Sequence, residues 1–323
     1  MKRLCFIIPY FGKFPNYFPL FLKTCGTNPH FNWLVFTDDK EDYGYPDNVR
    51  RILMSFEECK ALVKSKFDCD VNLNMPYKLC DLKPMYGYIF ESYLSDYKFW
   101  GHCDVDTIMG NLEHWLTDEF LDQYDKLFCL GHMTIYRNTH ENNRLFMTTY
   151  KGCEVYKEVL ATPLIYTFDE EWKDNSNICR IFESVGKRIY RKDLSFNVAC
   201  AYNRFRRIEF VGSDRVNDIN GYKFEEYKES LYVWNNGNLY RLYVEDETLK
   251  KEDFLYMHFQ NRKMKMDCTI LQECKFEIIP DEFRYWKYSE VTINNFNQIP
   301  KPCKSHLQLQ MFLKRIKRKF TKR

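Results

Sequence analysis

Two aspartates in the first third of the chain have a spacing that suits metal chemistry. Asp104 and Asp106 are separated by one residue, and in an extended segment that spacing turns both side chains to the same side. Paired carboxylate oxygens suit Mg²⁺ or Mn²⁺, which keep open positions for phosphate oxygens. A cation held there would neutralise a diphosphate leaving group. The pair therefore indicates a divalent-metal site acting on a phosphorylated substrate.

The D-x-D spacing is weak evidence by itself, because Asp68 and Asp70 have it too. Context favours the later pair. The apolar residues 97–100 predict a strand that leads into it, and Gly101 would let the backbone approach a ligand closely. Ligands of open α/β sheets bind beyond the carboxyl ends of strands, which is where this pair falls.

Short apolar runs alternate with helical patterns through the first third of the chain, which is typical of β-α-β units and a mostly parallel sheet. We expect strands at residues 4–9, 33–37 and 98–100, and helices at residues 14–23, 57–67 and 79–93. Asp38 and Asp39 follow the second of these strands, at the same edge of the sheet.

The remainder of the chain is less regular. Residues 112–207 mix amphipathic helical stretches with a loop at 162–177, and residues 210–259 are rich in β-strand patterns with a hairpin turn at 235–238. We expect one α/β catalytic domain over residues 1–300, with a nucleotide-binding half at about 1–130 and an acceptor-side half at about 131–300. Residues 301–323 form a separate basic tail.

Composition narrows the class of protein. With 45% hydrophobic and 29% charged residues, the chain should fold as a globular protein. The thirteen cysteines are odd in number and include no C-x-x-C pair, so reduced thiols are expected rather than a disulfide framework or structural zinc. The first apolar run ends at Pro9, too early for a secretion signal, and no later segment approaches the roughly 18 apolar residues of a membrane span. These features predict a cytoplasmic protein.

The basic tail suggests where in the cell the protein acts. Residues 311–323 hold seven basic residues and no acidic one, and without them the formal net charge falls from +3 to −4. Apolar residues recur at helical spacing opposite these charges, which favours an amphipathic helix on an anionic membrane surface, at the inner face of the cell membrane. A solvated disordered end and a nucleic-acid arm are the alternatives.

The surroundings of the D-x-D pair resemble a known family. Residues 97–107 (YKFWGHCDVDT) and 110–112 (GNL) are similar to the D-x-D region of a bacterial capsule and surface-polysaccharide glycosyltransferase family of GT-A type, long described as a domain of unknown function. Further similar segments are residues 76–78, 80–84, 86–87, 131–134, 136–138, 168–170 and 256–260. The resemblance runs in order over residues 3–265. It implies a Rossmann-like GT-A fold, which is that of nucleotide-diphospho-sugar transferases, with a mostly parallel central sheet.

The resemblance also implies roles for individual residues. Asp106 would be the main metal ligand, Asp104 would touch the metal or the donor ribose, and His258 would be the third ligand. His132 would lie near the donor sugar and acceptor. The residues expected to surround the nucleotide and its diphosphate are Pro9, Tyr10, Phe11, Asp38, Asp81, Lys83, Arg262 and Lys263. Uridine is expected by analogy with other such enzymes.

Three of these positions have structural alternatives. His258 could be a structural histidine, Asp81 could cap a helix that starts near Pro84, and His132 could belong to a turn at the end of a strand.

An inverting transferase needs a base for the acceptor hydroxyl. Asp169 and Glu170 are the candidates, with Asp169 favoured, whereas a retaining enzyme would need neither.

These residues together predict a metal-dependent glycosyltransferase that uses Mn²⁺ or Mg²⁺. It would move a hexose, with galactopyranose or galactofuranose expected first, from a UDP-sugar to a hydroxyl of a growing, lipid-linked surface polysaccharide. No nucleic-acid partner is expected.

Other functions remain open. A metal-dependent nucleotidyltransferase or phosphohydrolase could use the same carboxylates, although residues 7–12 lack the glycine-rich phosphate loop of a nucleotidyltransferase. A non-catalytic protein that docks on membrane or nucleic acid is disfavoured, because clustered acids would repel a polyanion. Glycoside hydrolysis by Asp169 and Glu170 ranks last, since adjacent residues on a strand point apart.

Overall fold

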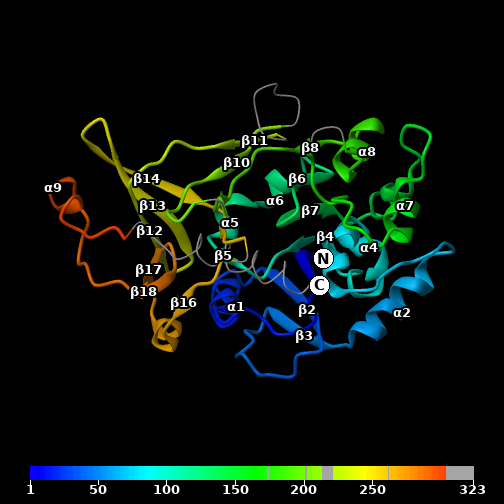
Figure 1. Ribbon diagram of the computed structural model, residues 1–323, viewed down its shortest axis with the longest axis horizontal. Coiled ribbons are helices and arrows are strands. Elements are labelled where there is room, and N and C mark those ends of the chain that lie inside the picture. Colours follow the sequence, from blue (N-terminus) through cyan, green and yellow to red (C-terminus); the bar gives the residue numbers. More distant parts are fainter. Residues whose placement is uncertain (173–174, 201, 213–220, 261, 303–323) are drawn as a thin grey trace, which may run out of the picture.

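The apolar run that opens the chain forms β1 (Lys2–Pro9), the middle of a parallel group in a seven-stranded sheet (Figure 1). The computed structural model describes residues 1–172, 175–200, 202–212, 221–260 and 262–302. The amphipathic helix expected at 311–323 lies outside these residues. Among them, no helix is both long and apolar enough to span a membrane.

The large sheet has the strand order β3-β2-β1-β4-β7-β6-β8. The first four strands are parallel, β7 runs antiparallel to both of its neighbours, and β8 is parallel to β6. The bounds of the other strands are β2 (Phe31–Thr37), β3 (Val49–Leu53), β4 (Tyr97–Cys103), β6 (Lys126–Leu130), β7 (Met133–Arg137) and β8 (Ile189–Tyr190). The predicted α/β class with a mostly parallel central sheet is confirmed.

Proline and capping residues mark where the first two helices begin. The helix expected from residue 14 begins later, as α1 (Phe18–Gly26), with a proline in its first turn, where a missing N–H costs nothing. α2 (Phe56–Lys66) begins at a capping box between Ser55 and Glu58.

The prediction of a single helix over residues 79–93 is wrong. The segment is divided into α3 (Leu79–Leu82) and α4 (Tyr86–Ile89), with 3₁₀ turns at Pro76–Lys78, Lys83–Met85 and Glu91–Tyr93. Pro84 explains the break, because it lacks an N–H and its ring clashes with the preceding turn.

The other helices are short: α5 (Leu112–Trp115), α6 (Asp118–Leu121), α7 (Val155–Ala161), α8 (Ile178–Ser184) and α9 (Ile293–Phe296). In Figure 1, α2, α4, α7 and α8 lie together at one end of the molecule. The 3₁₀ turn Asn142–Met147 contacts α4, α7 and α8, so it joins this group to the sheet.

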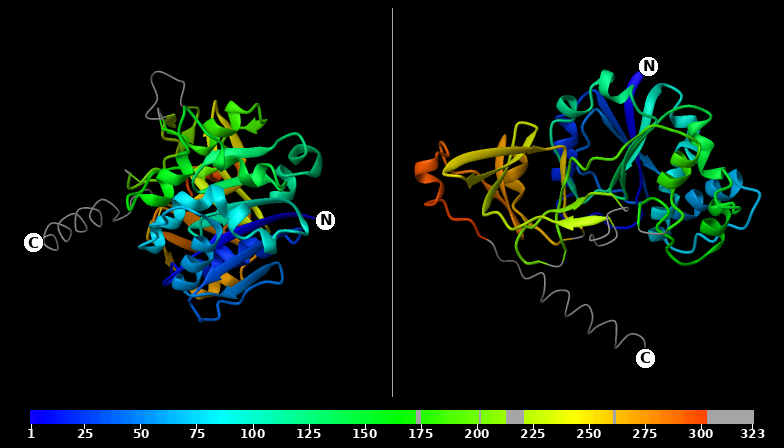
Figure 2. Two further views of the ribbon diagram at one scale, coloured as in Figure 1. Left: turned by 90° about the vertical axis from the view of Figure 1, so that its right-hand side faces the viewer. Right: turned by 90° about the horizontal axis from the view of Figure 1, so that it is seen from above.

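A second sheet of six strands forms a separate lobe at the opposite end (Figure 2). Its order is β14-β13-β12-β17-β18-β16, with bounds β12 (Ser230–Asn235), β13 (Asn238–Glu245), β14 (Thr248–Phe254), β16 (Lys265–Met266), β17 (Lys275–Ile279) and β18 (Glu282–Tyr285). The hairpin expected at residues 235–238 is confirmed between β12 and β13. Its central residues Asn236 and Gly237 both have positive φ, as a tight hairpin turn requires. β10 (Ile208–Phe210) and β11 (Tyr222–Phe224) form a further pair.

A three-stranded sheet links the two parts and completes the candidate site. Its strands are β5 (Thr107–Met109), β15 (Tyr256–His258) and β9 (Phe196–Asn197), in the order β5-β15-β9. The register places His258 opposite Thr107 on one side and Asn197 on the other. A residue from the last third of the chain is thus brought beside the D-x-D segment.

Candidate functional site

The D-x-D segment is held at both ends by backbone hydrogen bonds. It follows the end of β4, where the Asp104 N–H donates to the carbonyl of His132 over 3.0 Å. The Phe259 N–H donates to the carbonyl of Asp106, also over 3.0 Å. The segment therefore lies fixed between β7 and the strand that carries His258.

Gly101 has a different role from the one expected. It lies inside β4, and a Cβ there would sit 2.6 Å from the carbonyl oxygen of Thr134. The glycine permits close packing of β4 on β7, rather than close approach to a ligand.

Asp104, Asp106 and His258 form a potential metal-binding cluster. Each offers one ligand atom, and these atoms all lie within 4.8 Å of one another. Nε2 of His258 is 3.4 Å from Oδ1 of Asp106 and 3.8 Å from Oδ2 of Asp104. The two carboxylates are donors suited to Mn²⁺ or Mg²⁺, and the imidazole is a donor typical of transition-metal sites.

A second layer of hydrogen bonds orients the imidazole. Nδ1 of His258 lies 3.0 Å from Oδ1 of Asn197, and the Gln260 amide donates to the same oxygen over 2.9 Å. An oxygen acceptor facing Nδ1 places the proton there, which leaves Nε2 as the ligand atom. Burial by itself lowers the pKa of His258, but the negative charge of Asp106 and Asp104 outweighs it and raises this pKa. The site thus has a negative potential that a bound cation would relieve.

His132 stacks on His258 and is not among the residues that line the cleft. The two rings stack with centroids 4.4 Å apart, and Nδ1 of His132 lies 2.7 Å from the Tyr256 hydroxyl. Burial lowers the pKa of His132, as does the charge of His258, so its ring is neutral. It occupies the turn between β6 and β7, the structural alternative considered for it.

A cleft of about 2240 Å³, open to solvent, contains most of the predicted site residues. The predicted residues that line it are Pro9, Tyr10, Phe11, Lys83, Asp104, Asp106, Asp169, Glu170, Arg262 and Lys263. The segment after β1 supplies an aromatic wall, in which Tyr10 stacks on Phe14 at 4.5 Å. Such a wall suits a nucleotide base or a sugar ring.

Asp38 supports this wall without lining the cleft. Its exposed carboxylate accepts a hydrogen bond from the Gly12 N–H over 2.8 Å. Gly12 has a φ of 93°, a conformation that glycine adopts without strain. Asp38 therefore fixes the turn that carries Tyr10 and Phe11.

Lys83 connects the D-x-D segment to the predicted base. Its Nζ donates to Asp104 Oδ1 over 2.8 Å and to the Gly131 carbonyl over 2.6 Å, and it lies 3.6 Å from Asp169 Oδ2. Burial disfavours the charge on Lys83, but Asp104 and Asp169 outweigh it and raise its pKa. Lys83 is thus a fixed cation between two carboxylates.

Asp169 is 4% exposed, and burial raises its pKa to about 8 despite the nearby charge of Lys83. A carboxyl group with such a pKa holds a proton more strongly than an ordinary aspartate, as a general base must. Its neighbour Glu170 accepts a hydrogen bond from the Trp172 indole over 2.8 Å. Gly131 makes room for Glu170, because a Cβ there would sit 2.2 Å from its Oε1.

Asp81 does not line the cleft, and it does not cap a helix. It is fully buried, pairs with Lys78 over 2.8 Å, and accepts hydrogen bonds from the N–H groups of Tyr166, Thr167 and Phe168. A buried carboxylate requires such partners. Asp81 therefore anchors the segment that leads to Asp169.

Arg262 also departs from its predicted role. Although it borders the cleft, its guanidinium donates to backbone carbonyls, including those of Tyr202 at 2.8 Å and Pro280 at 3.1 Å. It is 2% exposed, so its charge stabilises the local backbone instead of facing a diphosphate. Lys263 next to it is exposed and lines the cleft.

Three further residues at or beside the site were not predicted from the sequence. Lys13 is an exposed lysine lining the cleft, and its position after the Pro9–Gly12 segment could have suggested it. His102 lines the cleft with both ring nitrogens lacking a protein partner among the described residues, and burial lowers its pKa. Asn197 gives no local signal, because its role depends on the pairing of β9 with β15.

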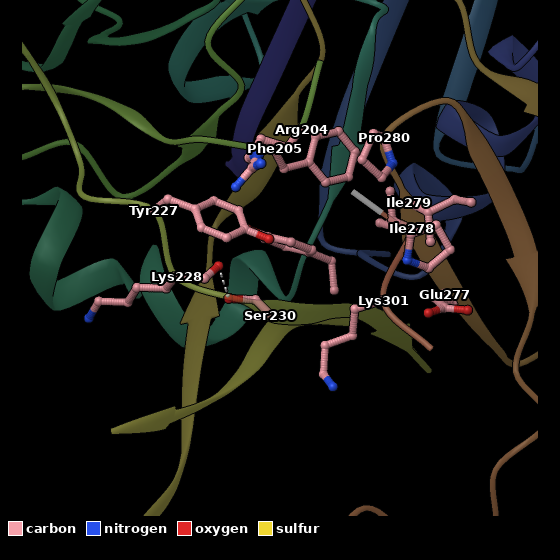
Figure 3. Close-up of a pocket in the computed structure, with 12 residues that line it drawn as sticks. Arg204, Phe205, Tyr227, Lys228, Ser230, Glu277, Ile278, Ile279, Pro280 and Lys301 are labelled. Carbon is pink, nitrogen blue, oxygen red and sulfur yellow. Dashed lines mark hydrogen bonds between the residues drawn. The ribbon is translucent and has the colours of Figure 1, made fainter. Parts of the chain in front are cut away.

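A second, much smaller pocket lies in the β-rich lobe (Figure 3). Its volume is about 340 Å³, and it is bordered by Tyr227, Phe205 and Ile279. The ammonium groups of Lys228 and Lys301 point away from it in Figure 3. Its size and its lack of a carboxylate cluster make it a poor match for a nucleotide sugar.

Comparison with known proteins gives no match among curated proteins. Among solved structures, the galactosyltransferase LgtC in complex with donor and acceptor sugar analogs matches with a TM-score of 0.33 and 11% identity, over 60% of this chain and 75% of that one. An active-site mutant of LgtC matches with the same score and identity, over 74% of its own chain. Similarity at this level supports no conclusion about activity.

A family model gives a more extensive match. It describes a family of unknown function, DUF6625, and matches residues 6–287, which include the D-x-D segment, Asp169 and His258. The chain belongs to this family.

Proposed function

We propose that the protein is a metal-dependent glycosyltransferase that uses a UDP-sugar. The observation that carries the proposal is that Asp104 and Asp106 converge with His258 and line the same cleft as Asp169. Ligands for a divalent cation and a buried carboxyl group with a raised pKa are what inverting transfer from a diphosphate donor to a hydroxyl uses.

The cleft offers separate places for the parts of the donor. Tyr10, Phe11 and Phe14 would take the base, and Lys13 and Lys263 would lie near the phosphates. A divalent cation held by the three ligands would supply positive charge to the diphosphate leaving group. Lys83 holds Asp104 in place for this task.

Asp169 is the proposed base for an inverting reaction. Its carboxylate would take the proton of the acceptor hydroxyl as that oxygen attacks the sugar. Lys83, at 3.6 Å, would stabilise the ionised form from which Asp169 acts. In a retaining reaction Asp169 would bind substrate without accepting the proton.

The finer specificity is part of the same proposal and is supported by the sequence alone. We propose galactose, in pyranose or furanose form, as the sugar and a lipid-linked surface polysaccharide as the acceptor. The seven basic residues of 311–323 would hold the protein at the inner face of the cell membrane.

Calorimetric titration with UDP, with and without Mn²⁺, tests the proposal directly. We expect Mn²⁺-dependent binding that Asp106→Asn abolishes and that Asp68→Asn leaves unchanged. Asp68 is a matched control because it belongs to the other D-x-D pair and is exposed. Failure of UDP, GDP and CMP to bind in the presence of Mn²⁺ would exclude a nucleotide-sugar site.

The products of turnover distinguish the alternatives. A glycosyltransferase incubated with UDP-galactose and acceptor releases UDP. Release of UMP with sugar 1-phosphate would indicate a phosphohydrolase acting on the diphosphate, and consumption of UTP with sugar 1-phosphate would indicate a nucleotidyltransferase.

A further inference from the structure

Two buried cysteines from separate elements meet outside the cleft. Cys129 lies in β6 and Cys179 in the first turn of α8, and neither side chain has solvent exposure. Their sulfur atoms and a carboxylate oxygen of Glu171, also fully buried, all lie within 4.8 Å of one another. The fold thus brings together two thiols that are fifty residues apart in the chain.

The charges around the pair favour an anionic sulfur. Lys126 is fully buried, and its Nζ lies 3.2 Å from the Cys179 sulfur while also donating to the Phe128 carbonyl. Glu171 is paired with Arg191 and lies 3.6 Å from Arg180. A thiolate at Cys179 would compensate the buried charge of Lys126, as a buried cation requires.

The two thiols differ in acidity. Burial alone raises the pKa of Cys179, but hydrogen bonding from Cys129 and the charge of Lys126 outweigh it, and the pKa of Cys179 is lowered. Burial and the same hydrogen bond raise the pKa of Cys129. Cys179 is therefore the more acidic of the two thiols, and Cys129 is the neighbour that donates a hydrogen bond to it.

A metal ion is the alternative occupant of such a cluster, but the local charge opposes it. Lys126, Arg180 and Arg191 already surround the group, and Glu171 is engaged by two guanidinium groups. Adding a divalent cation would place like charges together in a buried site.

We propose that Cys129 and Cys179 form a reversible disulfide when the protein meets a peroxide. The Cys179 thiolate attacks one peroxide oxygen, so that an S–O bond forms as the O–O bond breaks, and the departing hydroxide takes up a proton as water. The Cys129 thiol then attacks the Cys179 sulfur; the S–S bond forms, the S–O bond breaks, and the second oxygen leaves as water with the thiol proton. The two sulfurs lose two electrons in total, and the peroxide is reduced by two.

The cross-link would act on the segment that carries Asp169. The Glu171 N–H donates to the Cys129 carbonyl over 3.3 Å, and Glu171 is two residues after Asp169. A disulfide would tie β6 to α8 on either side of this contact, and closing it requires the sulfurs to approach to about 2.05 Å. The inference is independent of the proposed transferase activity, because the pair exists whether or not the cleft binds UDP.

Peptide mapping of the whole protein tests the cross-link. The protein is treated with hydrogen peroxide, blocked with iodoacetamide and digested without reductant. We expect a cross-linked peptide joining Cys129 to Cys179, two hydrogens lighter than the sum of its parts, that dithiothreitol removes. Cys129→Ser and Cys179→Ser should each abolish it while the far-ultraviolet circular dichroism spectrum stays the same.

A second variant tests the role of the lysine. Lys126→Met should slow formation of the cross-link at pH 7 roughly tenfold, because a smaller fraction of Cys179 is then thiolate. If this variant does not fold, the pH dependence of the wild-type rate replaces it. The rate of cross-link formation should rise with pH below pH 7, as Cys179 ionises, and change less between pH 7 and pH 9, where Cys179 is mostly ionised.

Two results would overturn the inference. In one, peroxide oxidises the exposed Cys153 and Cys268 while Cys129 and Cys179 both remain alkylatable after unfolding. In the other, the native protein binds one equivalent of Zn²⁺ that Cys179→Ser removes, which would make the pair a metal site.

Discussion

Nε2 of His258 lies 3.4 Å from Oδ1 of Asp106, although the two residues are 152 positions apart in the chain. The pairing of β15 with β5 produces this proximity, and the Asn197 amide sets the orientation of the ring. The proposed metal site therefore depends on the three-stranded sheet, and residues outside the three proposed ligands should affect it.

Asn197→Ala should weaken Mn²⁺ binding by about 10- to 100-fold, because the imidazole loses the acceptor that fixes its proton and orientation. Calorimetric titration with Mn²⁺ measures the change. His30→Ala is the control, since His30 is exposed, contacts Glu113 and is not a member of the cluster. Equal Mn²⁺ affinity in Asn197→Ala and the wild type would show that the oriented ring is not a ligand.

Asp169→Asn should lower kcat by about 10² to 10⁴ while leaving UDP affinity almost unchanged, because the amide cannot accept the hydroxyl proton. The wild-type rate should rise with pH up to the region of the Asp169 pKa, about 8, since only the ionised form accepts a proton. Initial rates with a UDP-sugar between pH 6 and pH 9 measure both effects. A wild-type profile that is flat over this range would assign the proton transfer elsewhere.

The same carboxyl group should make stability depend on pH. Its pKa is raised from 3.8 to about 8, so between these values the folded state holds a proton that the unfolded chain has lost. The free energy of unfolding should therefore be greatest below pH 4 as far as this group is concerned, and fall by up to about 1.4 kcal/mol per pH unit toward pH 8.

Urea unfolding at pH 5, 6.5 and 8 measures this dependence. Asp169→Asn should flatten the curve, so that its stability relative to the wild type improves as pH rises. The opposite trend, with the variant losing relative stability toward pH 8, would mean that Lys83 keeps Asp169 ionised.

The Lys78–Asp81 pair should be structural. Asp81→Asn leaves the buried Lys78 ammonium without its counter-charge, and such a loss costs about 3–5 kcal/mol. Urea unfolding checks this value. Glu57→Gln is the matched control, because the Glu57–Lys60 pair has the same spacing on the exposed surface, and its loss should change stability by less than about 0.5 kcal/mol.

Lys263 and Arg262 should respond differently to substitution. Lys263→Met should weaken UDP binding several-fold more than uridine binding, because only UDP has the diphosphate. Arg262→Met should instead lower stability, since its guanidinium binds the backbone carbonyls of Tyr202 and Pro280. Calorimetry with both ligands, together with urea unfolding, separates the two roles. Equal losses for UDP and uridine in Lys263→Met would place the diphosphate elsewhere.

The local pattern of the sequence was sufficient to predict the first strands and the position of the residues that follow them. β1, β2 and β4 are apolar runs between polar turns. Tyr10 follows the end of β1 and Asp104 follows the end of β4, where a parallel sheet collects its ligand-binding groups. α2 has both of its capping residues in sequence, so its start was recognisable to within a residue.

The wrong predictions concern residues whose roles depend on tertiary contacts. Asp81 and Arg262 have the residue types of a phosphate or nucleotide site, but each is buried against backbone groups that are distant in sequence. The role of Asn197 depends on a parallel pairing with β15, and β9 is only two residues long, too short to give a periodic signal.

The pairing of β15 with β5 also has a consequence for biosynthesis. A ribosome makes the two aspartates long before it makes His258, so the nascent chain carries its carboxylates without their imidazole partner. The proposed cation site would be complete only when the last third has emerged and β15 has paired with β5. Under the proposed function, products of premature termination before Tyr256 would retain the D-x-D segment, lack the third proposed ligand and leave nucleotide sugar unused.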